Sequence, residues 1–275
     1  MAGTLYVVAT PLGNLGDLSP RAADTLKRVA VVAAEDTRHT KPLLTYVGSH
    51  AELVSFHAHS SERAVARILR LLGLGKDVAL VTDAGTPAIS DPGAILVAAA
   101  RARDVPVVTI PGPTAVAASL SVSGLAADRY LFLGFLPRKG TDRRRLLETV
   151  ARSEWTVVVF EAPNRVAQLL ADLSDACGPD RKAAVSRELT KVFEETRSGT
   201  LAELVAHYAD APVRGEVTVV VSGTGKEHHE EPPPDAGERA RALLAEGLSR
   251  KDVADRLAEE TGISRNTAYR LVNDL

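Results

Sequence analysis

Cysteine is almost absent from this chain of 275 residues, which contains only Cys177. A single cysteine excludes an internal disulfide framework and is typical of proteins from a reducing compartment. Long apolar runs are missing too, because no stretch is long enough to span a bilayer. No cationic segment precedes the short apolar run near the N-terminus, so a signal peptide is not expected. We therefore expect a cytoplasmic protein with no membrane partner.

An excess of charge of either sign is also missing. Lysine and arginine number 33, aspartate and glutamate number 35, and the formal net charge is −2. The whole chain therefore has no basic field that would indicate a nucleic-acid partner. With 45% hydrophobic and 25% charged residues, the composition is that of an ordinary globular protein. The length is enough for two compact domains, or for one large domain with an appendage.

The common nucleotide-binding fingerprints are absent. No G-x-G-x-x-G follows the first predicted strand, residues 5–9, where Gly13 and Gly16 have the wrong spacing. Lys76 and Lys226 each follow a glycine but lack the upstream glycine and the Ser/Thr of a P-loop. Nicotinamide and nucleoside-triphosphate sites are therefore disfavoured.

What the sequence does contain is organised around residues 77–115. This stretch predicts two apolar strands joined by a helix, with each strand ending in a Gly/Pro-rich loop: strands 78–82 and 105–110, helix 92–103, loops 83–90 and 111–114. We expect Asp91 to cap the helix and Pro92 to occupy its first position. Both loops would then lie at the carboxyl edge of one parallel sheet, where open α/β sheets bind ligands. Ordinary chain connection is the alternative use of these glycines and prolines.

The same alternation of strands and helices continues along the chain. We predict an α/β domain over residues 1–122, a second with a mixed sheet over 123–223, and a donor-binding cleft between them. Residues 224–237 contain three consecutive prolines and predict a linker. Residues 238–275 predict three helices arranged as a small helix-turn-helix-like module. Residues 235–275 hold seven basic and eight acidic residues, which disfavours an independent DNA-binding role.

Four motifs occur in a specific order: T-P-L-G-N-L-G-D at 10–17, A-E-D-T-R at 34–38, D-A-G-T-P-A-I-S-D-P-G at 83–93 and P-G-P-T-A at 111–115. Together they resemble the tetrapyrrole methylase superfamily, and within it the branch that methylates the ribose 2′-oxygen of a cytidine in 16S ribosomal RNA. The resemblance covers roughly residues 4–222. It implies S-adenosylmethionine as methyl donor, 16S rRNA or the small ribosomal subunit as partner, and a homodimer.

The resemblance also implies which residues contact the donor: Pro11, Leu12, Asp83, Ala84, Gly85, Ile89, Thr114, Ala115 and Phe160. Small residues in such loops let the backbone approach a ligand closely. Glu216 or Val217 is a further candidate for the adenine side. Asp83 has an alternative role as a loop cap. We expect no metal site.

Methyl transfer to a ribose hydroxyl needs a proton acceptor or tight positioning. Glu35, Asp36 and Arg38 follow a predicted buried strand and should face the same cleft. We predict that a carboxylate there accepts the proton and that Arg38 holds a phosphate. A purely structural Asp–Arg pair is the alternative. Lys191, in the polar cluster 186–191, is a further catalytic candidate.

Positive charge is concentrated in residues 137–152, which hold six basic residues and two acidic ones. Three consecutive arginines at a helix start oppose the helix dipole, so packing alone does not favour them there. We predict a phosphate-binding face for RNA, made by Arg138, Lys139, Arg143, Arg144 and Arg145. A solvated helix face is the alternative.

The combined prediction is an rRNA ribose 2′-O-methyltransferase that uses S-adenosylmethionine. One alternative is a porphyrinoid methyltransferase of the same superfamily, which would need neither the basic cluster nor the appended module. The other is a transcription regulator whose α/β body only senses S-adenosylmethionine. The slightly acidic tail argues against that second alternative.

Overall fold

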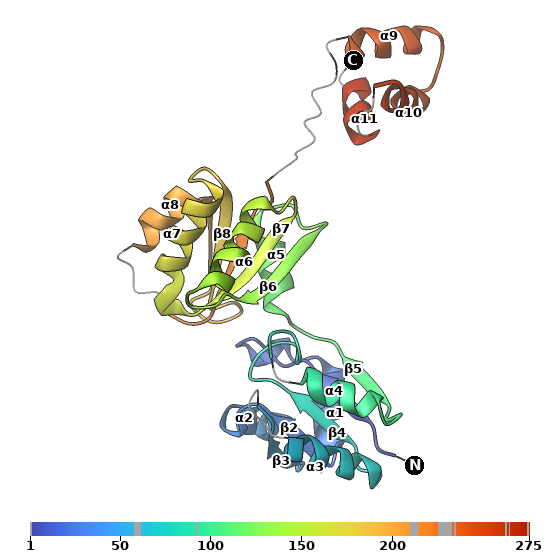
Figure 1. Ribbon diagram of the computed structural model, residues 1–275. Helices are drawn as coiled ribbons and strands as arrows, with labels where there is room; N and C mark the ends of the chain where they lie inside the picture. The colour runs from blue at the N-terminus through green and yellow to red at the C-terminus, as the bar shows by residue number, and fades with distance from the viewer. Residues whose placement is uncertain are drawn as a thin grey trace. The chain divides into compact units, whose positions relative to one another are not determined.

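The computed structural model describes residues 2–57, 62–91, 93–209, 214–224, 233, 235–261, 263, 265–273 and 275. It contains two compact units, Met1–Ala151 with Thr156–Ser222, and Arg152–Trp155 with Gly223–Leu275. The first unit holds two α/β sheets, and the second holds three helices (Figure 1). None of the described helices is long and apolar enough to cross a membrane.

The first sheet has five parallel strands in the order β3-β2-β4-β1-β5. They are β1 (Leu5–Val8), β2 (Val31–Ala34), β3 (Glu52–Ser55), β4 (Val78–Val81) and β5 (Val107–Ile110). Every residue of β2 and β4 is buried, which explains why both strands are entirely apolar. Val31 stands opposite Val78 in the register that joins them.

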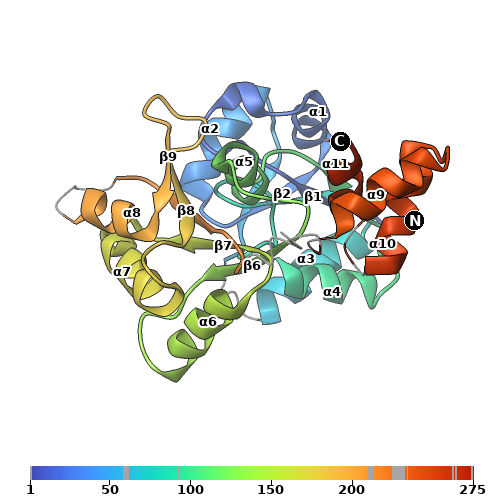
Figure 2. The ribbon, with the colours of Figure 1, turned by 90° about the horizontal axis from the view of Figure 1, so that it is seen from above.

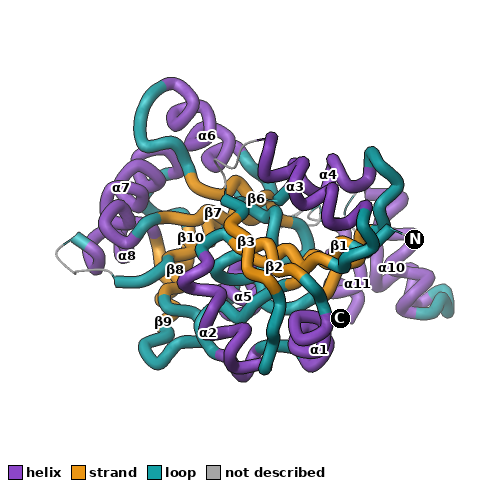
Figure 3. The backbone as a smooth tube through the Cα atoms, turned by 90° about the horizontal axis from the view of Figure 1, so that it is seen from below, coloured by secondary structure: helices purple, strands orange, loops and turns teal. Residues whose placement is uncertain are grey.

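Helices cover both faces of this sheet (Figure 3). One face packs on α1 (Pro20–Arg28) and α2 (Thr37–Val47), and the other on α3 (Glu62–Gly73) and α4 (Ala94–Arg101). The predicted start of α4 is wrong. Its N-cap is Gly93, with a φ of 136°, and Asp91 lies in the preceding loop. Pro92, the other part of that prediction, lies outside the described residues.

The second sheet is mixed, as predicted, with the order β6-β7-β10-β8-β9. Strands β6 (Tyr130–Phe135) and β7 (Thr156–Glu161) are parallel, and the remaining pairs are antiparallel, made with β8 (Lys182–Arg187), β9 (Glu195–Thr200) and β10 (Val217–Val221). One face carries α5 (Ala115–Ser123), and the opposite face carries α6 (Thr141–Arg152), α7 (Val166–Cys177) and α8 (Leu201–Tyr208) (Figure 2).

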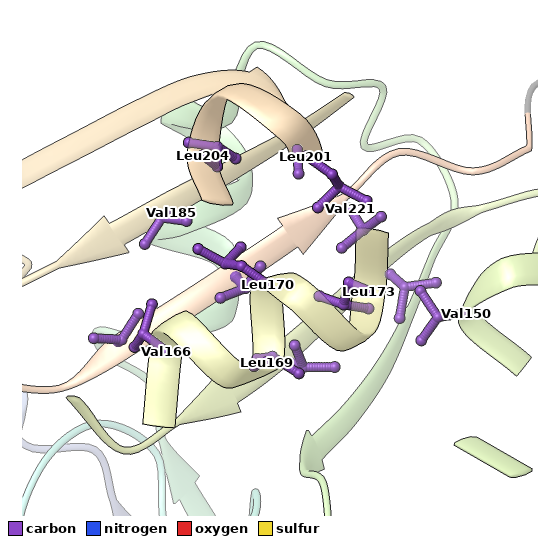
Figure 4. Packing of buried hydrophobic residues seen from close by; sticks show 14 of the residues in the cluster. Val150, Val166, Leu169, Leu170, Leu173, Val185, Leu201, Leu204 and Val221 are labelled. Carbon is purple, nitrogen blue, oxygen red and sulfur yellow. The ribbon is translucent and has the colours of Figure 1, made fainter. Parts of the chain in front are cut away.

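The main core of this second half is the apolar face of α7. Leu169, Leu170 and Leu173 are fully buried. They form one core cluster with Val185 and Val221 of the sheet and with Leu201 and Leu204 of α8, which Figure 4 shows. Each such buried side chain contributes about 1.5–3 kcal/mol relative to an exposed one. This packing fixes the second sheet, which contributes residues to the cavity described below.

The second unit is a three-helix module made of α9 (Ala236–Ala245), α10 (Arg250–Thr261) and α11 (Arg265–Asn273). It has its own core, which includes Leu243, Val253, Leu257 and Val272. The three helices agree with the sequence prediction. Most of the predicted linker, including residues 225–232, lies outside the described residues, and the predicted domain boundaries at 122 and 223 stay predictions.

Candidate active site

Three loops meet at the carboxyl edge of the first sheet. Thr10 and Gly85 exchange two backbone hydrogen bonds, of 2.9 and 3.1 Å between N and O. The Thr86 hydroxyl donates to the Pro113 carbonyl at 3.2 Å. Because β4, β1 and β5 are neighbours in the sheet, the loops that follow them lie side by side.

A cavity of about 330 Å³ lies against these loops. The first half lines it with Leu12, Ala84, Gly85, Thr86, Ile89, Asp91, Thr114 and Ala115, and the second half with Phe135, Phe160, Glu161, Ala162, Pro163, Glu216, Val217 and Thr218. Its size and its mainly apolar wall with a few polar groups are typical of a small-molecule site.

The structure brings together seven of the nine residues predicted to contact the donor: Leu12, Ala84, Gly85, Ile89, Thr114, Ala115 and Phe160. The further candidates Glu216 and Val217 line the same cavity. Pro11 and Asp83 do not line it. Asp83 accepts from the Asp36 N–H at 3.1 Å and contacts His39 Nδ1 at 3.1 Å, so its carboxylate joins two loops.

Sequence reasoning did not identify several lining residues. Phe135 ends β6 and Glu161 ends β7, and these strands are parallel. Residues at the carboxyl ends of parallel strands are expected near a site, so this position was the available signal. Glu161 is fully buried, with Oε1 held by Arg165 and by the Ala162 N–H at 2.8 Å. Its Oε2 has no hydrogen-bond partner among the described residues.

Asp91 is the lining residue with the most perturbed acidity. Burial raises the pKa of its carboxyl to about 7, and the negative charges of Glu35, Glu216 and Asp83 act in the same direction. A hydrogen bond with Thr82 opposes this shift. Asp91 is therefore close to half-ionised at neutral pH, which suits a group that exchanges a proton.

Asp36 and Arg38, which are predicted to be catalytic, pair with each other. Neither lines the cavity. Asp36 caps α2 by accepting from the Arg38 N–H at 2.8 Å, and it binds the Arg38 guanidinium at 2.6 Å. These hydrogen bonds hold the pKa of Asp36 well below its usual range and raise the pKa of Arg38. These contacts are those of the structural Asp–Arg pair that was the alternative, and the catalytic role of Asp36 and Arg38 stays a prediction.

The other two predicted catalytic residues also lie outside the cavity wall. Glu35 accepts from the Thr82 hydroxyl at 2.6 Å. Lys191 donates to Glu188 at 2.9 Å. Its side chain lies so close over Gly13 that a Cβ there would clash with it. Lys191 therefore packs on the first loop of the site.

The residues of the predicted basic face differ in whether another side chain already pairs with them. The Arg143 side chain is only 10% exposed and binds Asp172 through Nε at 2.8 Å and the Pro137 carbonyl through Nη1 at 2.9 Å. Arg143 is therefore not available to a phosphate, and its place in the predicted face is corrected. Arg145 pairs with Asp142 at 3.2 Å but stays exposed.

Three further residues of the predicted basic face are exposed to solvent. Arg138, Lys139 and Arg144 are exposed and form no ion pair within the described part of the chain. Arg138 borders a second cavity of about 490 Å³, together with Phe135, Leu136, Pro137, Ala162, Asn164 and Arg165. Phe135 and Ala162 line both cavities, so the two adjoin.

Solved methyltransferases share this fold. Cobalt precorrin-4 methyltransferase aligns with a TM-score of 0.63 at 19% identity, over 80% of this chain and 94% of its own. The uroporphyrin-III C-methyltransferase of Thermus thermophilus, complexed with S-adenosylhomocysteine, aligns with a TM-score of 0.58 at 21% identity, over 79% of this chain and 97% of its own. This chain thus has the α/β fold of these methyltransferases, which is built on two sheets.

Sequence comparison gives the family. Residues 4–205 match the model of the Tetrapyrrole (Corrin/Porphyrin) Methylases. "Ribosomal RNA small subunit methyltransferase I" of Synechocystis sp. is 42% identical over 99% of this chain and 98% of its own length. The protein of the same name from Xylella fastidiosa is 46% identical over 97% and 98%. The chain belongs to the tetrapyrrole methylase family, on the branch formed by these relatives.

Proposed function

We propose that this chain transfers the methyl group of S-adenosylmethionine to the ribose 2′-oxygen of a cytidine in small-subunit ribosomal RNA. The observation that carries the proposal is the cavity at the three joined loops, lined by the residues that the family motifs identify. The relatives named for the small-subunit RNA align over nearly the full length of this chain. We also propose a cytoplasmic location, which a small-subunit RNA substrate supports.

The residues of the cavity fit the donor. Gly85 has a φ of 82°, and a Cβ there would lie 3.3 Å from Leu12 Cδ2 and 3.7 Å from the Pro113 carbonyl oxygen. A side chain would thus fill space that a ligand can use. Leu12, Phe160 and Val217 supply an apolar surface for adenine, and the unpartnered Glu161 Oε2 can accept from an N–H or O–H of the donor.

When bound, S-adenosylmethionine supplies a methyl group activated by a positively charged sulfur. The chain's own contribution is to bind that cation, to exclude water from it and to orient the acceptor oxygen in line with the methyl. Carboxylates on the cavity wall favour the cation electrostatically. The neutral thioether product loses that attraction, which aids its release.

On the acceptor side, Arg138, Lys139, Arg144 and Arg145 supply exposed positive charge beside the second cavity. Arginine and lysine at such a surface bind RNA phosphates. We further propose that the protein acts as a homodimer, as the family resemblance implies. Sedimentation of the purified chain tests that state.

The experiment for the function uses the purified full chain, S-adenosylmethionine labelled in the methyl group, and small ribosomal particles from cells that lack the enzyme. Label should appear in the small-subunit RNA, on the ribose of one cytidine after digestion to nucleosides. Uroporphyrinogen serves as the competing acceptor. Label on the porphyrinogen and none on RNA would refute the proposal.

A further inference from the structure

Two residues from different halves of the chain, Gly134 and Ser90, lie next to each other. Gly134 has a φ of 63° and lies at an irregularity in the pairing of β6 with β7. A Cβ at Gly134 would lie 2.6 Å from the Ser90 hydroxyl oxygen. The residues that follow, Asp91 and Phe135, both line the first cavity.

Negative charge around the cavity is concentrated near Asp91, where Glu35, Glu216 and Asp83 all act on its carboxyl. The loops after β1 and β5 contribute the neutral residues Leu12, Thr114 and Ala115. Glu35 and Asp83 follow β2 and β4, on the other side of the sheet order, and their charges act on Asp91. The cationic sulfonium prefers this acidic end, whereas neutral adenine suits the apolar end. The transferable methyl group is therefore expected beside Asp91.

Phe135 provides a surface for a nucleobase. Phe135 is 56% exposed, which leaves a large aromatic residue open to a ligand at the end of a strand. Phe160 supports one edge of the ring, with centroids 5.5 Å apart. Arg138 borders the second cavity on the same segment, within reach of a phosphate. Arg138 forms no ion pair with any residue that the structure describes, and an exposed ring beside such an arginine is the combination that binds unstacked nucleotides of single-stranded RNA.

From this geometry, and resting on the function proposed above, we propose an acceptor site that spans the two cavities. It takes one unstacked RNA nucleotide, with its base on the ring of Phe135 and its 2′-hydroxyl against Asp91. The Asp91 carboxylate removes the hydroxyl proton as the oxygen attacks the methyl carbon. The C–S bond breaks and its electron pair stays on sulfur. S-adenosylhomocysteine then leaves, and the proton remains on Asp91.

The surroundings of Asp91 favour it over other carboxylates as the proton acceptor. Glu35 from the end of β2, Asp83 from the end of β4 and Glu216 before β10 face it, and Thr82 hydrogen-bonds to it. His39 lies beside Asp83. This environment raises the pKa of Asp91 to about 7. Glu161, in contrast, is already held by Arg165.

The backbone of the loop also indicates a function for Asp91. Ala88 and Ser90 have φ values of 68° and 63°, which cost energy for residues with a Cβ. This path takes Asp91 away from the N-terminus of α4, where it would cap the helix, and brings it to the cavity wall. Such strain persists when the surrounding structure enforces it, and it is common at active sites.

The test compares Asp91→Asn and Phe135→Ala with the wild-type full chain, in single-turnover methyl transfer to small ribosomal particles. Asp91→Asn should lower the rate constant by about 10²-fold or more. Its rate should lose the wild-type rise with pH between about 6 and 8. Its affinity for S-adenosylhomocysteine, measured by calorimetry, should stay within about threefold. A loss of affinity as large as the loss of rate would make Asp91 a donor ligand and overturn the proposal.

Phe135→Ala should raise the particle concentration needed for half-maximal rate by about 5- to 150-fold, the range measured for loss of base stacking. Phe135→Tyr, which keeps the aromatic ring, should need the same particle concentration for half-maximal rate as the wild type. Tyr130→Ala is the matched control, because Tyr130 is exposed at the other end of β6 and lines neither cavity. If the wild type methylates the particles and both site variants match it, this acceptor site is wrong. If the wild type transfers no methyl group to RNA, the proposed function fails with it.

Discussion

Thr10 and Gly85 are 75 residues apart in the chain, and each donates its backbone N–H to the carbonyl of the other. The Thr10 hydroxyl adds a hydrogen bond of 3.1 Å to the Thr82 carbonyl. These bonds fix the first loop of the sheet edge to the loop after β4. Gly85 is thereby held at a φ of 82°, next to the Leu12 side chain on the cavity wall.

Gly85→Val should abolish donor binding in a protein that still folds. The valine side chain would crowd Leu12 and the Pro113 carbonyl and narrow the cavity. A β-branched residue at this φ also costs about 1–3 kcal/mol of unfolding free energy. Calorimetry with S-adenosylhomocysteine should show an affinity loss of about 100-fold or more, and urea denaturation should show a single cooperative transition.

Gly48→Val separates the two effects. Gly48 has a φ of 68°, and a Cβ there would meet nothing within 4 Å. This variant should lose a similar amount of stability and keep wild-type donor affinity. Wild-type affinity in a folded Gly85→Val variant would contradict the placement of the donor in this cavity.

Much of the fold could be predicted because the local signals are strong. Strands β2 and β4 are continuous apolar runs, and parallel strands covered on both faces have that pattern. Ser19 caps α1, its hydroxyl accepting from the Ala22 N–H at 3.1 Å, and Pro20 follows it, a pairing that marks a helix start in a sequence. The loops that end β1, β4 and β5 were found from glycine and proline alone, since these residues interrupt strands.

The prediction failed where side chains depend on partners far along the chain. Asp91 has the sequence of a helix cap, but the positive φ values before it turn it toward the cavity, and nothing local indicates that. Arg143 resembles its neighbours Arg144 and Arg145, and only its pairing with Asp172 on α7 distinguishes it. Phe135 was missed because an aromatic residue that ends a strand usually belongs to the core.

Arg143→Ala should destabilise the protein without affecting RNA binding directly. The substitution leaves Asp172 partly buried without its cation and removes the bond to the Pro137 carbonyl. Breaking such a pair costs about 2–4 kcal/mol, somewhat less than for a fully buried one. Urea denaturation should report this loss. Unchanged stability would mean that the ion pair is not formed in solution.

The three exposed basic residues without an ion pair among the described residues should bind RNA through their positive charge. Replacing Arg138, Lys139 and Arg144 together with alanine should weaken binding to small-subunit RNA. The magnitude of the slope of log affinity against log salt concentration should fall by about 2–3, because each of the three residues accounts for up to one phosphate contact. Fluorescence titrations between low and moderate salt measure this slope. If the triple variant has the same slope as the wild type, these residues form an ordinary solvated surface and do not bind RNA.

The three-helix module should be dispensable for donor binding. A chain that ends after Thr224 keeps β10 and the hydrogen bond from the Thr224 N–H to the Ser153 carbonyl, and it removes only a module with its own core. Calorimetry with S-adenosylhomocysteine should give the affinity of the full chain, with any loss confined to methyl transfer to particles. A truncated chain that fails to fold or to bind donor would place the module within the core.

Asp91→Asn should stabilise the free protein at high pH while it impairs methyl transfer. The folded-state pKa of Asp91 is about 7, against 3.8 as its ordinary value. The folded form therefore holds a proton that the unfolded form releases, so the free energy of unfolding falls as pH rises from about 4 to 7. Above pH 7 the charged carboxylate is fully destabilising, and below pH 4 it has no effect. Asparagine removes this cost.

Discounted for partial exposure, the gain of Asp91→Asn should be about 1–2 kcal/mol at pH 8 and should vanish near pH 4. Thermal unfolding measured across this range gives the comparison, with an expected rise of about 2–8 °C at pH 8. Asp128→Asn is the control, because Asp128 is exposed and makes no side-chain bond among the described residues. Parallel stability curves for Asp91→Asn and the wild type would mean that Asp91 is an ordinary carboxylate. Curves that diverge with pH would show that the site keeps this carboxyl at a cost to stability, as expected for a group retained for its chemistry.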